Sequence, residues 1–147
     1  MKENFTEQIQ RQFQLSEEIN ADVYSPLTLA FLGDNVYELV NRTVLVSKAN
    51  APVNKLNKKS SSLAKAAAQA EMARLLMEDL TDEEKAVFKR GRNAKSYTMA
   101  KNATMHDYRH ATGWEVLIGY LYLQGKYERL VFLICEGQKR LTKEEKV

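Results

Sequence analysis

Apolar residues fall on nearly every side of a helix drawn from Leu27 to Val46, and Asp34 is the carboxylate in its middle. A helix that is apolar all round is a buried helix, so this pattern predicts a long buried helix that carries a buried acid. Ser25 and Pro26 suit its N-cap and its first helical position. Gly33 would weaken an isolated helix. Its place directly before Asp34 indicates that something approaches the backbone closely there.

Helical spacing of apolar residues recurs on both sides of this stretch, with cap signals between the segments. Thr81 and Glu84 have the spacing of a capping box, and Gly125 suits the position after a helix end. The pattern predicts one all-α domain of about six or seven helices at residues 25–141, with an N-terminal extension at 1–24 and a flexible tail at 142–147. The other predicted helices are a short amphipathic one near the N-terminus, two within 51–76 that are separated at Ser60–Ser62, one from Thr81 to about Gly91, one from Thr104 to Gly125, and one from Lys126 to Leu141.

The composition supports this fold class and narrows the function. The chain has 147 residues with 44% apolar and 28% charged residues, which is ordinary for one soluble globular domain. Its one cysteine, Cys135, excludes an internal disulfide and a cysteine-rich zinc site, and its apolar neighbours predict a small core residue. The N-terminus lacks an apolar signal region, and no uncharged apolar run reaches about 18 residues. We therefore expect a cytoplasmic protein that does not enter a membrane.

Charge is segregated along the chain although the net charge is only +3. No acid occurs from Leu39 to Ala70 or from Lys85 to His106, and each of these segments carries several lysines and arginines. Separation of this kind raises the local positive potential. It favours a polyanionic partner.

A second apolar stretch, Thr112–Tyr120, repeats the pattern of the first, with Glu115 as its only acid. If the two helices meet, Asp34 and Glu115 lie together in an apolar core. Buried carboxylates must be hydrogen-bonded, paired or bound to a metal. Each acid could cap a helix or pair with a core arginine, or the two could hold Mg²⁺, which needs few protein ligands and keeps several waters.

Four other side chains have both a structural and a functional interpretation. Glu38 could join the acids or form an exposed ion pair. His106 and His110 have the i, i+4 spacing of a metal clip, but no third zinc ligand stands near them in the sequence. Trp114 suits a core position better than a base-stacking one.

The segment Arg90–Ser96 is predicted to be a basic loop, and its glycine would let a ligand approach the backbone. It is either a solvated turn or a phosphate contact, because Arg and Lys neutralise phosphates and Asn donates hydrogen bonds to them. Arg109 could likewise contact phosphate or neutralise a carboxylate. The candidate phosphate-binding residues are Arg90, Arg92, Asn93, Lys95 and Arg109, with Lys58 and Lys59 as a second strip.

Three of these stretches resemble motifs of one enzyme family. Phe31–Val36 resembles the signature of the ribonuclease III catalytic domain, an all-α nuclease fold, and Trp114–Tyr122 resembles its second carboxylate helix. Lys89–Ser96 resembles the basic loop of the short branch, mini-ribonuclease III, which lacks the double-stranded-RNA-binding domain. The resemblance covers roughly residues 25–140.

The resemblance implies a function beyond what the residues show by themselves. It implies a Mg²⁺-dependent homodimer that cuts double-stranded RNA, with Asp34 and Glu115 as the metal carboxylates and the basic residues as contacts to the RNA. The short branch trims precursor large-subunit ribosomal RNA in bacteria with help from a ribosomal protein. Ala30 and Thr112 stand where longer family members carry further acidic ligands. Two alternatives stay open: a non-catalytic RNA-binding module of the same fold, or a helical protein–protein adaptor with a buried ion pair.

Overall fold

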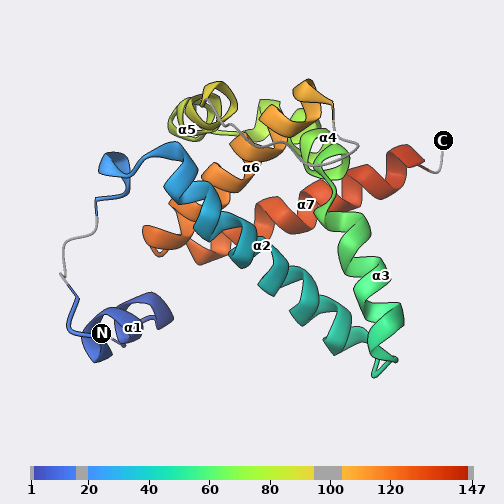
Figure 1. Ribbon diagram of the computed structural model, residues 1–147, viewed down its shortest axis with the longest axis horizontal. Coiled ribbons are helices and arrows are strands. Elements are labelled where there is room, and N and C mark those ends of the chain that lie inside the picture. The colour runs from blue at the N-terminus through green and yellow to red at the C-terminus, as the bar shows by residue number, and fades with distance from the viewer. Residues whose placement is uncertain (1, 16–19, 95–103, 146–147) are drawn as a thin grey trace.

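The computed structural model describes residues 2–15, 20–94 and 104–145. Within these ranges every regular element is a helix, which confirms the predicted all-α fold class. Figure 1 shows the helices in chain order. They are α1 (Phe5–Gln12), the 3-10 turn η1 (Ala21–Val23), α2 (Pro26–Lys48), α3 (Val53–Ala64), α4 (Ala66–Leu76), the 3-10 turn η2 (Met77–Asp79), α5 (Asp82–Asn93), α6 (Met105–Leu123) and α7 (Tyr127–Glu145).

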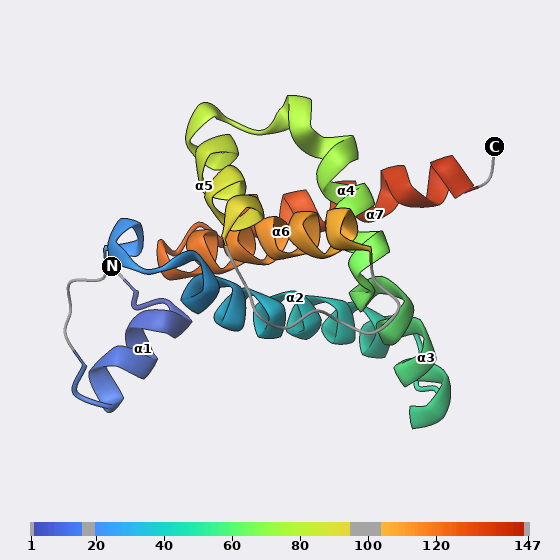
Figure 2. The same cartoon turned by 45° about the horizontal axis from the view of Figure 1, so that its top comes forward.

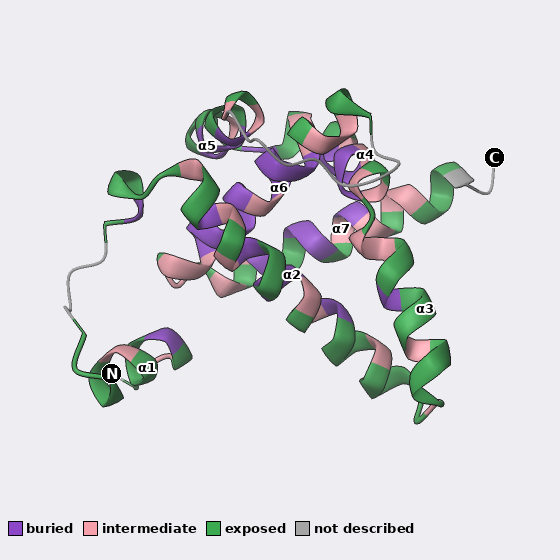
Figure 3. Ribbon diagram, in the orientation of Figure 1, coloured by how far each residue is buried: buried purple, intermediate pink, exposed green. Residues whose placement is uncertain are grey.

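Helix α6 is the centre of the fold. It crosses the middle of the molecule and contacts α2, α4, α5 and α7 (Figure 2). Its residues from Ala111 to Leu121 are buried except for Glu115, and Figure 3 shows this buried stretch in purple. Trp114 is buried and meets the ring of Tyr37 edge to face at 6.0 Å, so it is a core residue as predicted.

The helix ends follow the local signals of the sequence. The side chain of Ser25 accepts the Thr28 amide at 3.2 Å, and Thr81 and Glu84 form the predicted capping box. Thr104 caps α6 by accepting the Asp107 amide at 3.0 Å. Caps of this kind satisfy the first amides of a helix, which have no partner within it.

Helix α2 is buried along one side only, so the prediction of a helix buried all round is wrong. Leu29 and Tyr37 are almost fully buried, whereas Phe31 is 85% exposed and Leu39 is 58% exposed. An apolar side chain is buried only where another element covers it, and α6 covers one face of α2. The second half of α2 diverges from α6 and runs toward α3, which it contacts (Figure 1).

Two predicted helix boundaries in the first half of the chain are wrong. Helices α3 and α4 are separated at Lys65, which has extended backbone, and not at the three serines. Ser62 does not cap a helix, because its hydroxyl donates to the Lys59 carbonyl inside α3 at 2.8 Å. The Gln69 side chain donates to the Ala64 carbonyl at 2.8 Å and so satisfies the end of α3.

Three expectations for the second half of the chain also need correction. Helix α5 does not stop near Gly91 but continues to Asn93, since Gly91 packs tightly against α6. Helix α7 runs to Glu145, so residues 142–145 are helical where a flexible tail was expected, and Glu144 bonds to Arg74 at 3.0 Å. Cys135 is exposed, because it lies on the outward side of α7.

Candidate active site

The two candidate carboxylates are brought together where α2 crosses α6. A Cβ atom on Gly33 would lie only 1.8 Å from the Glu115 backbone oxygen, and one on Gly119 only 2.2 Å from the Leu29 backbone oxygen. Only glycine fits such contacts, because real Cβ atoms do not approach a backbone so closely. The close approach predicted at Gly33 is therefore the backbone of α6.

This crossing sets the Asp34 and Glu115 side chains beside each other. Glu115 is half-buried, while Asp34 is exposed, so the expectation of a buried Asp34 is wrong. Burial first, and then the hydrogen bond and negative charge of Asp34, raise the pKa of Glu115 to about 8. A carboxyl group whose protonated form is favoured in this way, beside a second carboxylate that is open to solvent, offers a place where a cation can replace the proton.

The described residues around the pair provide two carboxylate ligands for a metal and no third acidic one. Within the described parts of the chain, no group of three or more His, Cys, Asp or Glu side chains is close enough to hold an ion. Glu38 pairs with Arg42 at 3.6 Å instead, which confirms its exposed pairing. Thr112 donates its hydroxyl to the Tyr108 carbonyl at 2.9 Å, and Ala30 packs against the core. Two carboxylates with an open side fit Mg²⁺, which commonly completes its shell with water and substrate phosphate.

Several of the predicted phosphate-binding residues meet in one pocket. Arg92, Asn93 and Arg109 line it together with His106 and His110, between the end of α5 and the start of α6. Arg92 and Asn93 are part of the helix and not of a loop. Helix α6 therefore carries both this basic pocket and the carboxylate Glu115.

The other basic candidates lie outside this pocket. Arg90 is exposed near the end of α5, and Lys58 and Lys59 are exposed on α3. Lys95 falls outside the described residues. Gly91 is buried, because a Cβ there would meet the Val116 side chain at 2.7 Å and Gly113 at 2.9 Å. That glycine serves helix packing, so the expectation that it admits a ligand to the backbone is wrong.

Comparison with known proteins shows which family the chain belongs to. The Ribonuclease III domain family matches residues 27–126, which include both carboxylates. A Mini-ribonuclease 3 of Brevibacillus brevis is 48% identical over 130 residues, covering 83% of this chain and 97% of that protein. The chain belongs to the mini-ribonuclease III family. A Mini-ribonuclease 3 of Thermoanaerobacter is 51% identical over 106 residues, covering 72% and 75% of the two chains.

A solved structure agrees with this assignment. The crystal structure of a Fusobacterium nucleatum protein matches with a TM-score of 0.72 and 32% identity, covering 84% of this chain and 95% of that one. As a member of the mini-ribonuclease III family, the protein is an endoribonuclease. The alternatives of a non-catalytic RNA-binding module and of an adaptor are thereby set aside. Ribonucleases III act on double-stranded RNA, depend on divalent metals and typically form dimers.

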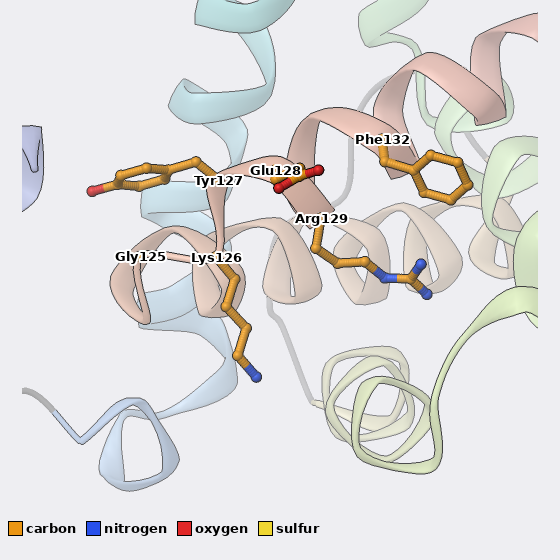
Figure 4. Close-up of a pocket in the computed structure, with 6 residues that line it drawn as sticks. All are labelled: Gly125, Lys126, Tyr127, Glu128, Arg129 and Phe132. Atoms are coloured by element: carbon orange, nitrogen blue, oxygen red, sulfur yellow. The ribbon is translucent and has the colours of Figure 1, made fainter.

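Two further findings concern the membrane and a second pocket. Among the described residues, no helix has the length and apolar character needed to cross a membrane. A pocket at the turn between α6 and α7 is lined by Lys126, Tyr127 and Arg129 among others (Figure 4). Arg129 is already bonded to Glu84 at 2.8 Å, and Tyr127 extends toward α1, where it bonds to Thr6. None of the predicted site residues lines this pocket, so it is not the candidate active site.

Proposed function

We propose that this protein is a Mg²⁺-dependent, homodimeric endoribonuclease that cuts double-stranded RNA and matures precursor large-subunit ribosomal RNA in the cytoplasm. The observation that carries the proposal is the Asp34–Glu115 pair at a crossing that only glycines permit. Family membership supports the reaction class, and the resemblance to the short branch supports the substrate. The same resemblance implies a ribosomal protein that assists cleavage.

Asp34 and Glu115 would hold the metal through their carboxylate oxygens. When bound, Mg²⁺ polarises the scissile phosphate, lowers the pKa of a coordinated water and stabilises charge on the leaving oxygen. The donor set fits such an ion, because two adjacent carboxylates repel each other when both are ionised. Burial contributes most to the raised pKa of Glu115, and the neighbouring Asp34 adds to it.

Glu115 and Asp34 have different roles in this site: Glu115 must release a proton, and Asp34 leaves room for the substrate. Glu115 gives up its proton before both of its oxygens can serve as ligands. Asp34 is exposed and so leaves the pair open on the side from which a phosphate can approach. We expect water to be the nucleophile, and products with 5′-phosphate and 3′-hydroxyl ends, as the resemblance implies.

The proposed dimer rests on an apolar surface beside the carboxylate pair. Phe31 is 85% exposed, and Leu27, one turn earlier on α2, is 40% exposed. Exposed apolar side chains one helical turn apart can form a continuous patch, and such a patch favours a surface that a partner covers. Because Phe31 and Asp34 are three residues apart, they are neighbours on one face of α2. A second copy bound at Phe31 would therefore sit next to the site, and two sites across a two-fold axis would cut opposite strands.

The pair is tested by removing each negative ligand while keeping its shape. Asp34→Asn and Glu115→Gln should each lower the cleavage of a defined RNA duplex in Mg²⁺ at least 100-fold, about 2.7 kcal/mol of transition-state stabilisation. Circular dichroism should show that both variants remain folded. EDTA should abolish cleavage by the unmodified protein.

Glu38→Gln is the matched control, because it removes a nearby carboxylate that pairs with Arg42. It should cleave like the unmodified protein. Full activity in either Asp34→Asn or Glu115→Gln would show that the pair does not hold the metal. A transcript with the processing stem of large-subunit ribosomal RNA, compared with an unrelated duplex of equal length, tests the proposed substrate.

A further inference from the structure

The described residues that line the pocket between α5 and α6 have cationic and donor side chains, and none of them is acidic. Arg92 and Asn93 come from the last turn of α5, and His106, Arg109 and His110 come from the first turns of α6. The two guanidinium groups stay charged at every physiological pH. A concave site of this composition attracts an anion.

His110 is held in one orientation inside this pocket. Its Nδ1 lies 2.8 Å from the His106 backbone oxygen, which can only accept a hydrogen bond, so Nδ1 carries the hydrogen. Its ring stacks on the His106 ring at 4.0 Å and lies 5.9 Å from the buried ring of Phe88. Nε2 is therefore the nitrogen left for a ligand.

The remaining polar groups of the pocket also favour an anion. The Asn93 side-chain oxygen accepts from Arg92 Nε at 3.2 Å, which leaves the Asn93 amide nitrogen as a donor. The charged or titratable groups around His110 are Arg92 from α5 and His106 and Arg109 from α6. Asp107 lies 3.6 Å from His106 Nδ1. This acidic neighbour therefore belongs to His106 and not to His110.

We propose that this pocket binds one backbone phosphate of duplex RNA, and that His110 takes up a proton from solvent on binding and donates Nε2–H to a phosphate oxygen. A bound phosphate attracts a protonated imidazole, so binding and proton uptake are linked. The identity of the ligand rests on the proposed function.

The place of the pocket on α6 connects it to cleavage. His110 precedes Glu115 by five residues, which is about 7.5 Å along a helix that rises 1.5 Å per residue. The same five residues turn through about 140° around the helix, so His110 faces α5 while Glu115 lies at the α2 crossing. A duplex that contacts both sites would therefore cross α6 between these two faces. His110 is a positioning residue here, because it grips the backbone and does not touch the reacting atoms.

The test measures duplex RNA binding in EDTA, where no cleavage occurs. The unmodified protein should bind about tenfold more tightly at about pH 6 than at about pH 8, the range over which histidine changes charge. His110→Asn keeps an amide that can donate to the His106 carbonyl but cannot take up a proton, so it should lose this gain. At about pH 6 it should also lower the slope of log binding constant against log salt by about one, with no change at about pH 8.

His106→Gln removes the other histidine that lines the pocket. It should lower affinity at both pH values but keep the ratio between them near that of the unmodified protein. A gain that persists in His110→Asn, disappears in His106→Gln or is absent from the unmodified protein would overturn the inference. If thermal unfolding shows that His110→Asn does not fold, His110→Gln replaces it, since glutamine offers a neutral donor near the Nε2 position. Cleavage of the same duplex in Mg²⁺ is measured separately, so failure of the nuclease function and failure of the phosphate site give different results.

Discussion

Glu115 has a pKa that lies far from that of a free carboxyl group. It lies half-buried in the central helix, and burial and Asp34 together raise its pKa from 4.5 to about 8. Between these two values the folded protein keeps a proton that the unfolded chain has released. The free energy of unfolding therefore falls as the pH rises through this interval.

Replacing the Glu115 carboxyl group by a neutral amide should stabilise the metal-free protein at mildly alkaline pH. Glu115→Gln should raise the free energy of unfolding at about pH 8 by roughly 1–2 kcal/mol, since one pKa unit is worth about 1.4 kcal/mol and water at the open side screens part of the effect. At about pH 4 the gain should vanish, because the carboxyl is then protonated in both states. Urea unfolding in EDTA at the two pH values measures this.

Glu38→Gln again serves as the comparison, because Glu38 has an exposed ion pair with Arg42 and should show no such dependence. An equal difference between Glu115→Gln and the unmodified protein at both pH values would contradict the raised pKa. Glu115→Gln should thus lose cleavage and gain stability at about pH 8. This trade-off is characteristic of a functional site, where a residue that the reaction needs lowers the stability of the fold.

At the scale of the elements, the crossing of α2 and α6 decides whether the carboxylates meet. Gly33 contacts the Glu115 backbone and Gly119 contacts the Leu29 backbone, so each glycine lets the other helix approach. The same helix pair carries Asp34 directly after Gly33. Packing and catalysis therefore depend on the same contact.

Gly33→Ala should separate the two helices. Its Cβ would lie 1.8 Å from a backbone oxygen, which cannot move aside as a flexible side chain can. We expect a loss of about 3 kcal/mol in the free energy of unfolding, at the upper end of overpacking effects, together with a loss of cleavage. Chemical denaturation and the duplex cleavage assay measure the two effects.

Gly137→Ala on α7 is the matched control. Its Cβ would meet the end of the Leu76 side chain at 3.1 Å, and alanine favours helix over glycine by about 1 kcal/mol. Stability near that of the unmodified protein is expected for Gly137→Ala, with cleavage retained. If Gly33→Ala behaved like this control, close packing at Gly33 would not be what positions the carboxylates.

At the scale of the whole molecule, the exposed apolar face of α2 and the segregated charge point to two different partners. Phe31 and Leu27 offer an apolar surface that suits a second copy. Arg92 and Arg109 offer a cationic pocket, and Lys58 and Lys59 lie on the outward-running α3 (Figure 2). The proposed protein and RNA contacts thus use different surfaces.

Phe31→Glu should weaken the proposed dimer by placing a charge in its apolar interface. We expect the dimer dissociation constant to rise at least tenfold, which corresponds to about 1.4 kcal/mol. Equilibrium sedimentation measures the change, and cleavage of duplex RNA should fall with the dimer fraction. Val53→Glu, at a 68% exposed apolar position on α3, is the control and should leave the dimer intact. A dimer of unchanged affinity in Phe31→Glu would place the interface elsewhere.

The sequence by itself determined the features that depend on neighbouring residues. The all-α fold class and the starts of α2, α5 and α6 were predicted correctly, because a cap is a contact between residues three positions apart. Gly125, with a φ of 71° that is accessible to glycine, follows the end of α6 at Leu123 as the sequence predicted. The motifs around Asp34 and Glu115 pointed to the family for the same local reason.

The tertiary structure alone decided which residues from different helices are in contact. It packed Gly91 inside α5 against α6, and it left Cys135 and Phe31 outside a core that their apolar neighbours had suggested for both. It also brought His110 into a pocket with Arg92, from another helix. These contacts join residues far apart in the chain, and periodicity shows which face of a helix is apolar but not what covers it.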